Sequence, residues 1–204
     1  MTLQHPALVD SLQRAFSAEK AAAFAYVGHA ASLRDRAVKV AVKQIEEDEW
    51  AHRVHVLAIM RQYGVPVSSY YEVKYAIIGK VIAASCHVIG WFMPIFFAGK
   101  LESGNVCEYF VMMQHFHSLG IREHDAILYE MGIKEKEHEV YFLDQIKGSR
   151  FLPFFERVFS WGRSASRNDV DLQAKYSITE SHRYCAAYQE SPVKVPAPFG
   201  SDGR

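Results

Sequence analysis

Two short motifs in this sequence pair a glutamate with a histidine three residues later, Glu49 with His52 and Glu135 with His138. Residues three apart lie side by side on a helix, so each motif presents a carboxylate and an imidazole together. Both groups are common ligands of first-row metals such as iron and manganese. Each motif alone is also common on solvated helices, and both segments are locally acidic. The alternative interpretation is that both motifs lie on charged, solvent-exposed helix faces.

The apolar residues around these motifs recur every three or four positions, which predicts that both motifs lie on the buried faces of helices. Two further segments show the same period and place a glutamate, Glu19 or Glu108, on the apolar face. The four expected buried stripes are Leu12, Phe16, Glu19, Ala23 and Tyr26; Val38, Val42, Ile45, Glu49, His52, Val56 and Met60; Leu101, Asn105, Glu108, Met112 and His115; and Leu128, Met131, Glu135, His138 and Phe142. Every expected helix therefore directs a carboxylate toward the core.

Four carboxylates in an apolar core need compensating positive charge, because an isolated buried carboxylate is costly or becomes neutral. No lysine or arginine shares the four stripes, whereas two divalent cations would balance four carboxylates. One glutamate from each of two helices plus E-x-x-H from the other two is the ligand pattern of ferritin-like di-iron and di-manganese bundles. We therefore predict a dinuclear metal site with the ligands Glu19, Glu49, His52, Glu108, Glu135 and His138.

The ligand from the third helix has two candidates, Glu102 and Glu108. Glu108 lies on the expected stripe and nearly level with Glu135 across the turn at Gly120. Glu102 lies beside Ser103 and could instead stabilise the start of a helix. We choose Glu108.

The elements that must position these residues are helices expected over residues 7–33, 38–63, about 104–118 and about 121–146, joined as two antiparallel pairs. Residues 81–99 carry no formal charge and have the length of a membrane span. A single crossing there would separate the two halves of the site. We therefore assign the segment to a long crossover, broken at Gly90 or Pro94, that contacts a membrane or covers the core or a dimer interface.

The predicted fold class is all-α, a ferritin-like four-helix bundle with a long apolar crossover between helices 2 and 3 and a short C-terminal amphipathic helix. The aromatic residues of 151–161 are interleaved with Arg150, Arg157 and Arg163, so this last helix could lie on a membrane surface. Residues 1–163 are expected to form one domain. Residues 164–204 form a polar tail whose last part is expected to be disordered.

Composition excludes some partners and compartments. Lysine plus arginine and aspartate plus glutamate each total 23, so nothing suggests a nucleic-acid surface. The cysteines Cys86, Cys107 and Cys185 are widely spaced and lack a C-x-x-C pattern, which favours a reducing compartment. The first residues show no signal peptide. We expect a peripheral protein on the cytoplasmic face of a bacterial-type membrane.

Several motifs resemble the demethoxyubiquinone hydroxylase family of ubiquinone biosynthesis. They are E-x6-Y-x-G from Glu19 to Gly28, E-x-x-H at Glu49, G-V-P at 64–66, a glycine-aromatic apolar segment at 90–100 that ends in Gly-Lys, the cysteine before Glu108, and E-x-x-H at Glu135. The resemblance covers roughly residues 10–145. His29 stands where the family usually has glutamine, and the connections around the third helix are shorter.

The resemblance implies a membrane-associated di-iron monooxygenase that uses dioxygen to hydroxylate a quinone-type aromatic lipid. The cofactors would be two iron ions, with manganese as the alternative metal, and the electron donor is not identified. By position, the family's ligands fall on the same six residues, and Tyr26 and His115 would contact ligands or bound oxygen. Simple core packing is the alternative for these two residues.

Two other functions fit the same pattern. One is a ferritin-like ferroxidase or peroxidase that inserts no oxygen, although the absence of C-x-x-C argues against its rubrerythrin-like form. The other is a metal-free helical membrane adaptor whose acidic residues face water. Metal content separates the adaptor from the two metal-dependent functions.

Overall fold

The computed structural model describes residues 3–159, which form six helices and no strands. The helices are α1 (Pro6–Ser32), α2 (Arg36–Gln62), α3 (Ser69–Ser85), α4 (Phe92–Ser118), α5 (Asp125–Ile146) and α6 (Leu152–Phe159). The all-α class is confirmed. The tail predicted for residues 164–204 lies outside the described residues.

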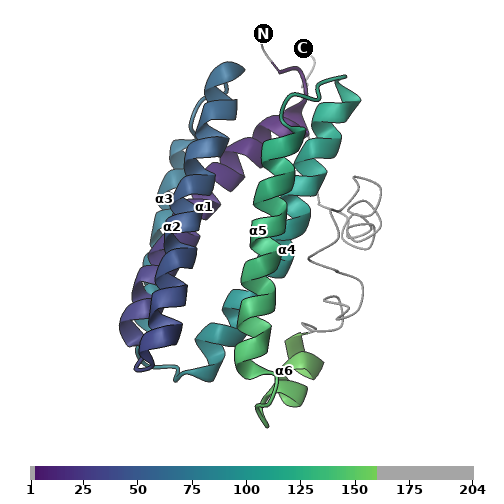
Figure 1. The fold of residues 1–204 in the computed structure, drawn as a ribbon. Coiled ribbons are helices and arrows are strands. Elements are labelled where there is room, and N and C mark those ends of the chain that lie inside the picture. Colours follow the sequence, from purple (N-terminus) through teal and green to yellow (C-terminus); the bar gives the residue numbers. More distant parts are fainter. Residues whose placement is uncertain (1–2, 160–204) are drawn as a thin grey trace, which may run out of the picture.

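The first two helices form an antiparallel pair with well-capped ends (Figure 1). The Asp35 carboxylate accepts hydrogen bonds from the backbone N–H groups of Ala37 and Val38, at 2.8 and 3.1 Å, and so starts α2. Pro6 takes the first position of α1, where a missing N–H leaves no intrahelical bond unmade. Both helices agree closely with the ranges expected from the sequence.

The second antiparallel pair, α4 and α5, differs from expectation at its start. The third long helix was predicted from about Gly104, but α4 begins at Phe92 and includes part of the apolar segment. The predicted break falls at Gly90, which adopts a left-handed backbone conformation with φ of 78°. Pro94 lies in the first turn of α4, where proline does not interrupt the helix. The predicted start was too late because the whole apolar segment 81–99 was assigned to the crossover.

The helix between the two pairs, α3, lies lengthwise against α1 (Figure 1). Glycine permits this close approach, because a Cβ atom added at Gly28 would lie 2.4 Å from the Cα of Ala83. Polar contacts hold the other end: Glu72 of α3 accepts hydrogen bonds from Lys20 of α1 and Arg53 of α2.

No helix among residues 3–159 combines the length and apolar character needed to cross a membrane.

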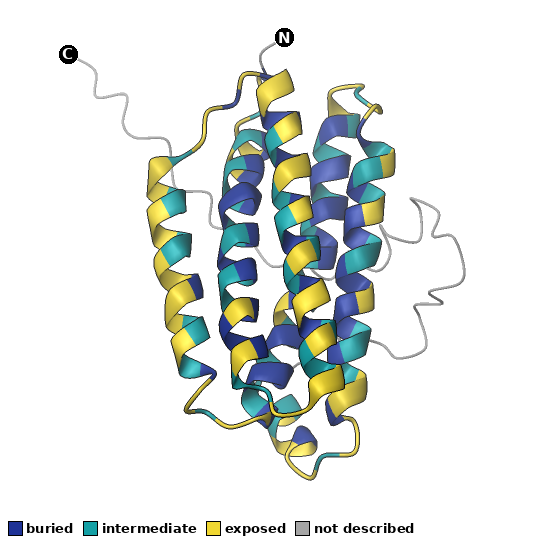
Figure 2. Ribbon diagram, turned by 60° about the vertical axis from the view of Figure 1, so that its left-hand side comes forward, coloured by how far each residue is buried: buried dark blue, intermediate teal, exposed yellow. Residues whose placement is uncertain are grey.

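The core consists of two apolar clusters separated by a polar layer halfway along the bundle. Leu12, Met60 and Phe116 belong to the first cluster, and Phe96 and Phe142 belong to the second. Buried residues line the inner faces of the long helices (Figure 2). The short C-terminal helix is confirmed as α6, whose Phe155 ring packs 5.1 Å from the Phe92 ring.

Candidate metal centre

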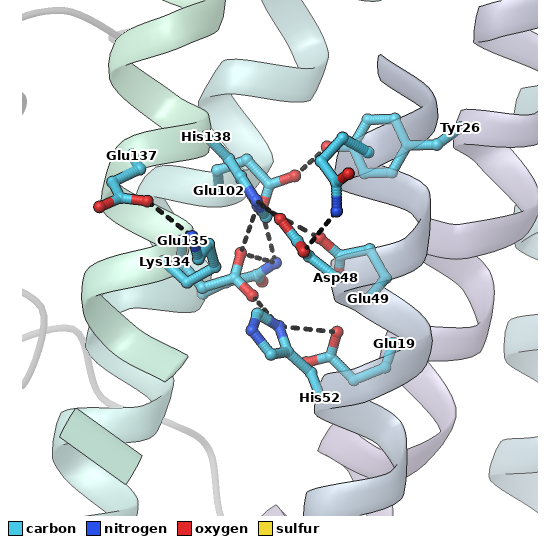
Figure 3. A network of polar contacts seen from close by, with 12 residues as sticks. Glu19, Tyr26, Asp48, Glu49, His52, Glu102, Lys134, Glu135, Glu137 and His138 are labelled. Carbon is cyan, nitrogen blue, oxygen red and sulfur yellow. Dashed lines mark hydrogen bonds and ion pairs between the residues drawn. The ribbon is translucent and has the colours of Figure 1, made fainter. Parts of the chain in front are cut away.

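The polar layer between the two apolar clusters is built by six acidic and histidine side chains from four helices. They are Glu19 of α1, Glu49 and His52 of α2, Glu102 of α4, and Glu135 and His138 of α5 (Figure 3). None of them is more than 5% exposed, and Glu49 and Glu135 are completely buried. Their burial contradicts the interpretation that the two motifs lie on solvent-exposed, charged helix faces.

These side chains form two overlapping groups, each able to offer four ligand atoms to one ion. One group contains Glu19, Glu49, His52 and Glu135, and the other contains Glu49, Glu102, Glu135 and His138. Within each group the ligand atoms all lie within 4.8 Å of one another. Glu49 and Glu135 belong to both groups, and each group contains one histidine, so these residues would suit two ions.

Both histidines turn the same ring atom toward the carboxylates. His52 Nδ1 lies 2.8 Å from Glu135 Oε1 and 3.9 Å from Glu19 Oε2. His138 Nδ1 lies 3.5 Å from Glu49 Oε1. The two Nδ1 atoms, both Glu49 oxygens, Glu19 Oε2 and Glu135 Oε1 are buried without a hydrogen-bond partner. An unpaired buried polar atom typically destabilises a protein by about 1–3 kcal/mol, so this concentration of facing oxygen and nitrogen atoms fits metal ions.

The pKa values of the clustered carboxylates are also consistent with bound cations. Burial, together with the neighbouring carboxylates, raises the pKa of Glu19, Glu49 and Glu102 well above the ordinary value. Burial also acts to raise the pKa of Glu135, but its interactions with Glu102 and the two histidines lower it to about 2. The basic side chains that lie against these carboxylates are His52 and His138. Bound cations would favour the ionised form of all four carboxylates.

Polar side chains around the cluster form hydrogen bonds with the candidate ligands. Tyr26 donates a hydrogen bond to Glu102, and Tyr109 donates one to Glu19. His138 Nε2 lies 3.0 Å from Asp48 Oδ2, which leaves Nδ1 facing the cluster. A carboxylate behind a histidine fixes the ring orientation and makes the imidazole a better ligand. The Asn105 amide donates to Glu102 Oε2 at 3.0 Å.

The structure brings together five of the six predicted ligands and corrects the sixth. Glu108 points away from the cluster and forms an ion pair with Arg14 at 3.1 Å, whereas Glu102 is 1% exposed within the cluster. Six residues correspond to about 600° of helical rotation, so the two glutamates point about 120° apart on α4. The expected stripe was displaced by one position, as the 57% exposure of Leu101 shows.

The two residues predicted to contact the ligands have different outcomes. Tyr26 lies beside the cluster, as the hydrogen bond to Glu102 shows. His115 does not, because it lies roughly 20 Å further along α4 from Glu102, where its ring packs against His5 at 4.7 Å. Its placement followed from the wrong choice of Glu108.

Sequence reasoning missed Tyr109, Asp48 and Asn105 as supporting residues. Tyr109 is two helical turns after Glu102 and therefore shares its face, so the correct ligand would have identified it. Nothing in the sequence pairs Asp48 with His138, which lies on another helix.

A cavity of about 610 Å³ reaches the cluster from the side of α3. Tyr26, Glu102 and Asn105 form part of its wall, while most of the remaining wall is apolar. The apolar wall includes Ala18, Ala21, Ala22 and Ala25 of α1, Ile78 and Ile82 of α3, Ile89, and Phe97, Ala98 and Leu101 of α4. The cavity therefore connects the candidate metal centre with a space suited to an apolar molecule.

Comparison of the chain with family models, with curated proteins and with solved structures finds no match in any of the three. The functional assignment consequently depends on the geometry and chemistry of the cluster and its cavity.

Proposed function

We propose that this protein is a ferritin-like di-iron monooxygenase that hydroxylates the aromatic ring of a quinone-type lipid. The observation that carries the proposal is the pair of four-ligand groups that share Glu49 and Glu135. Four carboxylates and two histidines, contributed by four long helices, suit two iron ions, with manganese as the alternative metal. In this view α3 is the crossover of a ferritin-like bundle.

The metal ions, when bound, would supply the redox chemistry that activates dioxygen. Hydroxylation consumes one O2, two electrons and two protons; one oxygen atom replaces a ring hydrogen as hydroxyl and the other leaves as water. The two electrons must come from an external donor. The chain's own contribution is to hold ligands, exclude water and orient the ring.

Several side chains are suited to those tasks. Tyr26 and Tyr109 restrain the carboxylates of Glu102 and Glu19, and Asp48 orients His138. Because Tyr26 and Glu102 also line the cavity, a ring bound there would lie next to the metal centre. The cavity wall is mainly apolar, with Lys100 and Glu108 as further charged lining residues, and so suits a lipid with a polar ring.

Exposed apolar residues support a membrane surface as the source of that lipid. On α3, Val73, Ile77 and Val81 are each about 60% exposed. In and beside the turn before α4, Val88 and Trp91 are exposed as well, and Phe154 of α6 is 64% exposed. Apolar side chains in such number are typical of a protein that lies on a membrane or binds another protein.

A single-turnover experiment tests the proposal. The protein is loaded anaerobically with ferrous iron, mixed with a short-tailed hydroquinone that has a free ring position, and exposed to ¹⁸O2. We expect one ¹⁸O atom in the product's new ring hydroxyl, and none with Glu49→Ala. Iron oxidation without labelled product would overturn the hydroxylase and favour a ferroxidase. A metal-free adaptor whose acids face water already disagrees with the burial of the cluster.

A further inference from the structure

His29 is a buried histidine that the metal centre does not use. It lies on α1 one turn after Tyr26 and is 2% exposed. Its Nε2 atom is shielded from solvent and has no hydrogen-bond partner. A buried polar atom of this kind has lost its hydration and gained no bond in return, so it calls for an explanation.

Apolar and aromatic contacts hold the plane of this imidazole. The His29 ring stacks near the Tyr26 ring, with centroids 6.4 Å apart and an interplanar angle of 27°. It also stacks near Phe142, at 6.0 Å and 20°. Half a turn about the Cβ–Cγ bond exchanges Nε2 with Cε1 and leaves this stacking unchanged. The ring can therefore reorient its nitrogen atoms within a fixed plane.

The position of His29 places it against two cavities. It lines the cavity of about 610 Å³ that reaches Tyr26 and Glu102. It also lines a second cavity of about 540 Å³, whose wall includes Arg34 and Asp35. The lining of the larger cavity is mainly apolar, and Tyr26, Glu102 and Asn105 already hydrogen-bond one another there, so the unpaired Nε2 of His29 remains open to a ligand.

Burial lowers the pKa of His29 to about 4, so the imidazole is neutral near pH 7. A neutral imidazole carries one N–H donor and one lone pair. It can accept a hydrogen bond from a phenolic hydroxyl or donate one to a quinone carbonyl. Both oxygen groups occur on the aromatic substrates considered above.

We propose that His29 is a specificity-determining residue that hydrogen-bonds a ring oxygen of the substrate and so holds the ring beside Tyr26 and Glu102. This inference rests on the proposed function, because it assumes an aromatic lipid in the larger cavity. A site built to hydrogen-bond a hydroxyl rejects an analogue that lacks it, because the buried polar group is then left unpaired. His29 would thus select oxygenated rings among apolar molecules of similar size.

The test uses metal-free full-length protein, so it does not depend on iron. Calorimetry compares the binding of 4-nonylphenol with that of 4-nonylanisole, in which a methyl group caps the hydroxyl. We expect wild type to prefer the phenol by on the order of tenfold. His29→Phe should abolish the preference, His29→Gln should keep part of it, and His55→Phe, the same change at an exposed position, should retain it.

Thermal unfolding separates this role from a structural one. Without ligand, His29→Phe should melt at or above the wild-type temperature, because phenylalanine fills the stack and removes the unpaired atom. An unchanged phenol preference in His29→Phe would overturn the inference, as would the absence of any preference in wild type. An equal loss of both ligands with a lower melting temperature would make His29 structural. Failure of iron binding would instead contradict the proposed function and leave the phenol preference intact.

Discussion

The negative charge of Glu72 and that of the glutamates in the central cluster are compensated in different ways. Glu72, which fastens α3 to the bundle, contacts Lys20 Nζ at 2.7 Å and Arg53 Nη2 at 2.9 Å. Although burial acts to raise the pKa of Glu72, hydrogen bonds from Arg53, Lys20 and Ser17 lower it to about 2. Glu49 in the central cluster has no such cationic partner, and its pKa is raised.

This difference separates a structural carboxylate from a candidate ligand. At Glu72 the chain supplies its own cations, so the ionised form is stable in the folded protein. In the central cluster the carboxylates face one another and two histidine nitrogens, so either protonation or bound cations must neutralise them.

The largest effect is expected from exchanging the two candidate glutamates of α4. Glu102→Gln should lower iron affinity by more than about 100-fold, because it removes a ligand from one of the two groups. Glu108→Gln should retain iron, since Glu108 pairs with Arg14 outside the cluster. Titration of ferrous iron under anaerobic conditions measures both. Loss of iron in Glu108→Gln with retention in Glu102→Gln would restore the choice made from the sequence.

A smaller effect on the metal is expected at Asp48. Asp48→Asn keeps the size of the side chain but weakens the interaction with His138 Nε2. Loss of such a partner typically lowers metal affinity by about 10–100-fold. The same iron titration detects this change, and Glu137→Gln, on the exposed side of α5, serves as the control. An unchanged affinity in Asp48→Asn would show that the aspartate does not tune the histidine.

Opposite changes in stability are expected when glutamate is replaced by glutamine at Glu49 and at Glu72. In metal-free protein at pH 7, Glu49→Gln should raise the free energy of unfolding, because it removes a buried acid that lacks a cation. Glu72→Gln should lower it by about 1–2 kcal/mol, because Arg53 and Lys20 lose their anionic partner. Denaturant unfolding measures both. Destabilisation of the metal-free protein by both changes would remove the contrast.

The smallest expected effect is a change in stability at acidic pH. The pKa of Glu72 is lowered from 4.5 to about 2 in the folded protein, so its ionised form is favoured by folding. Its contribution to stability is therefore complete above about pH 4.5 and is lost as the pH falls toward 2. The difference in unfolding free energy between wild type and Glu72→Gln should shrink over that range. A difference that is independent of pH would contradict the ion-pair account of Glu72.

The sequence predicted the buried faces of three helices and failed on the fourth for a physical reason. In α1, α2 and α5 the predicted stripes contained Glu19, Glu49 and Glu135, and all three side chains are buried. In α4 apolar residues occur nearly all the way around the helix, so the period did not distinguish Glu102 from Glu108. The early start of α4 at Phe92 added to the error, because it places Glu102 well inside the helix.

Other features depend on contacts between distant segments and leave no local pattern. The pairing of Asp48 with His138 and of Tyr109 with Glu19 needs the packed bundle. The cavity beside the cluster depends on how α3 lies against α1, which Gly28 and Gly79 permit through close contact. The apolar period therefore predicted the candidate ligands of three helices, and tertiary packing determined their supporting residues.

The central claim is that the cluster binds two iron ions, and the iron content of the protein tests it most directly. Wild-type protein purified anaerobically after iron-replete expression should contain close to two irons per chain. Glu49→Ala and Glu135→Ala should lose both ions, because each removes a carboxylate shared by the two groups. A folded wild-type protein without stoichiometric metal under these conditions would contradict the account.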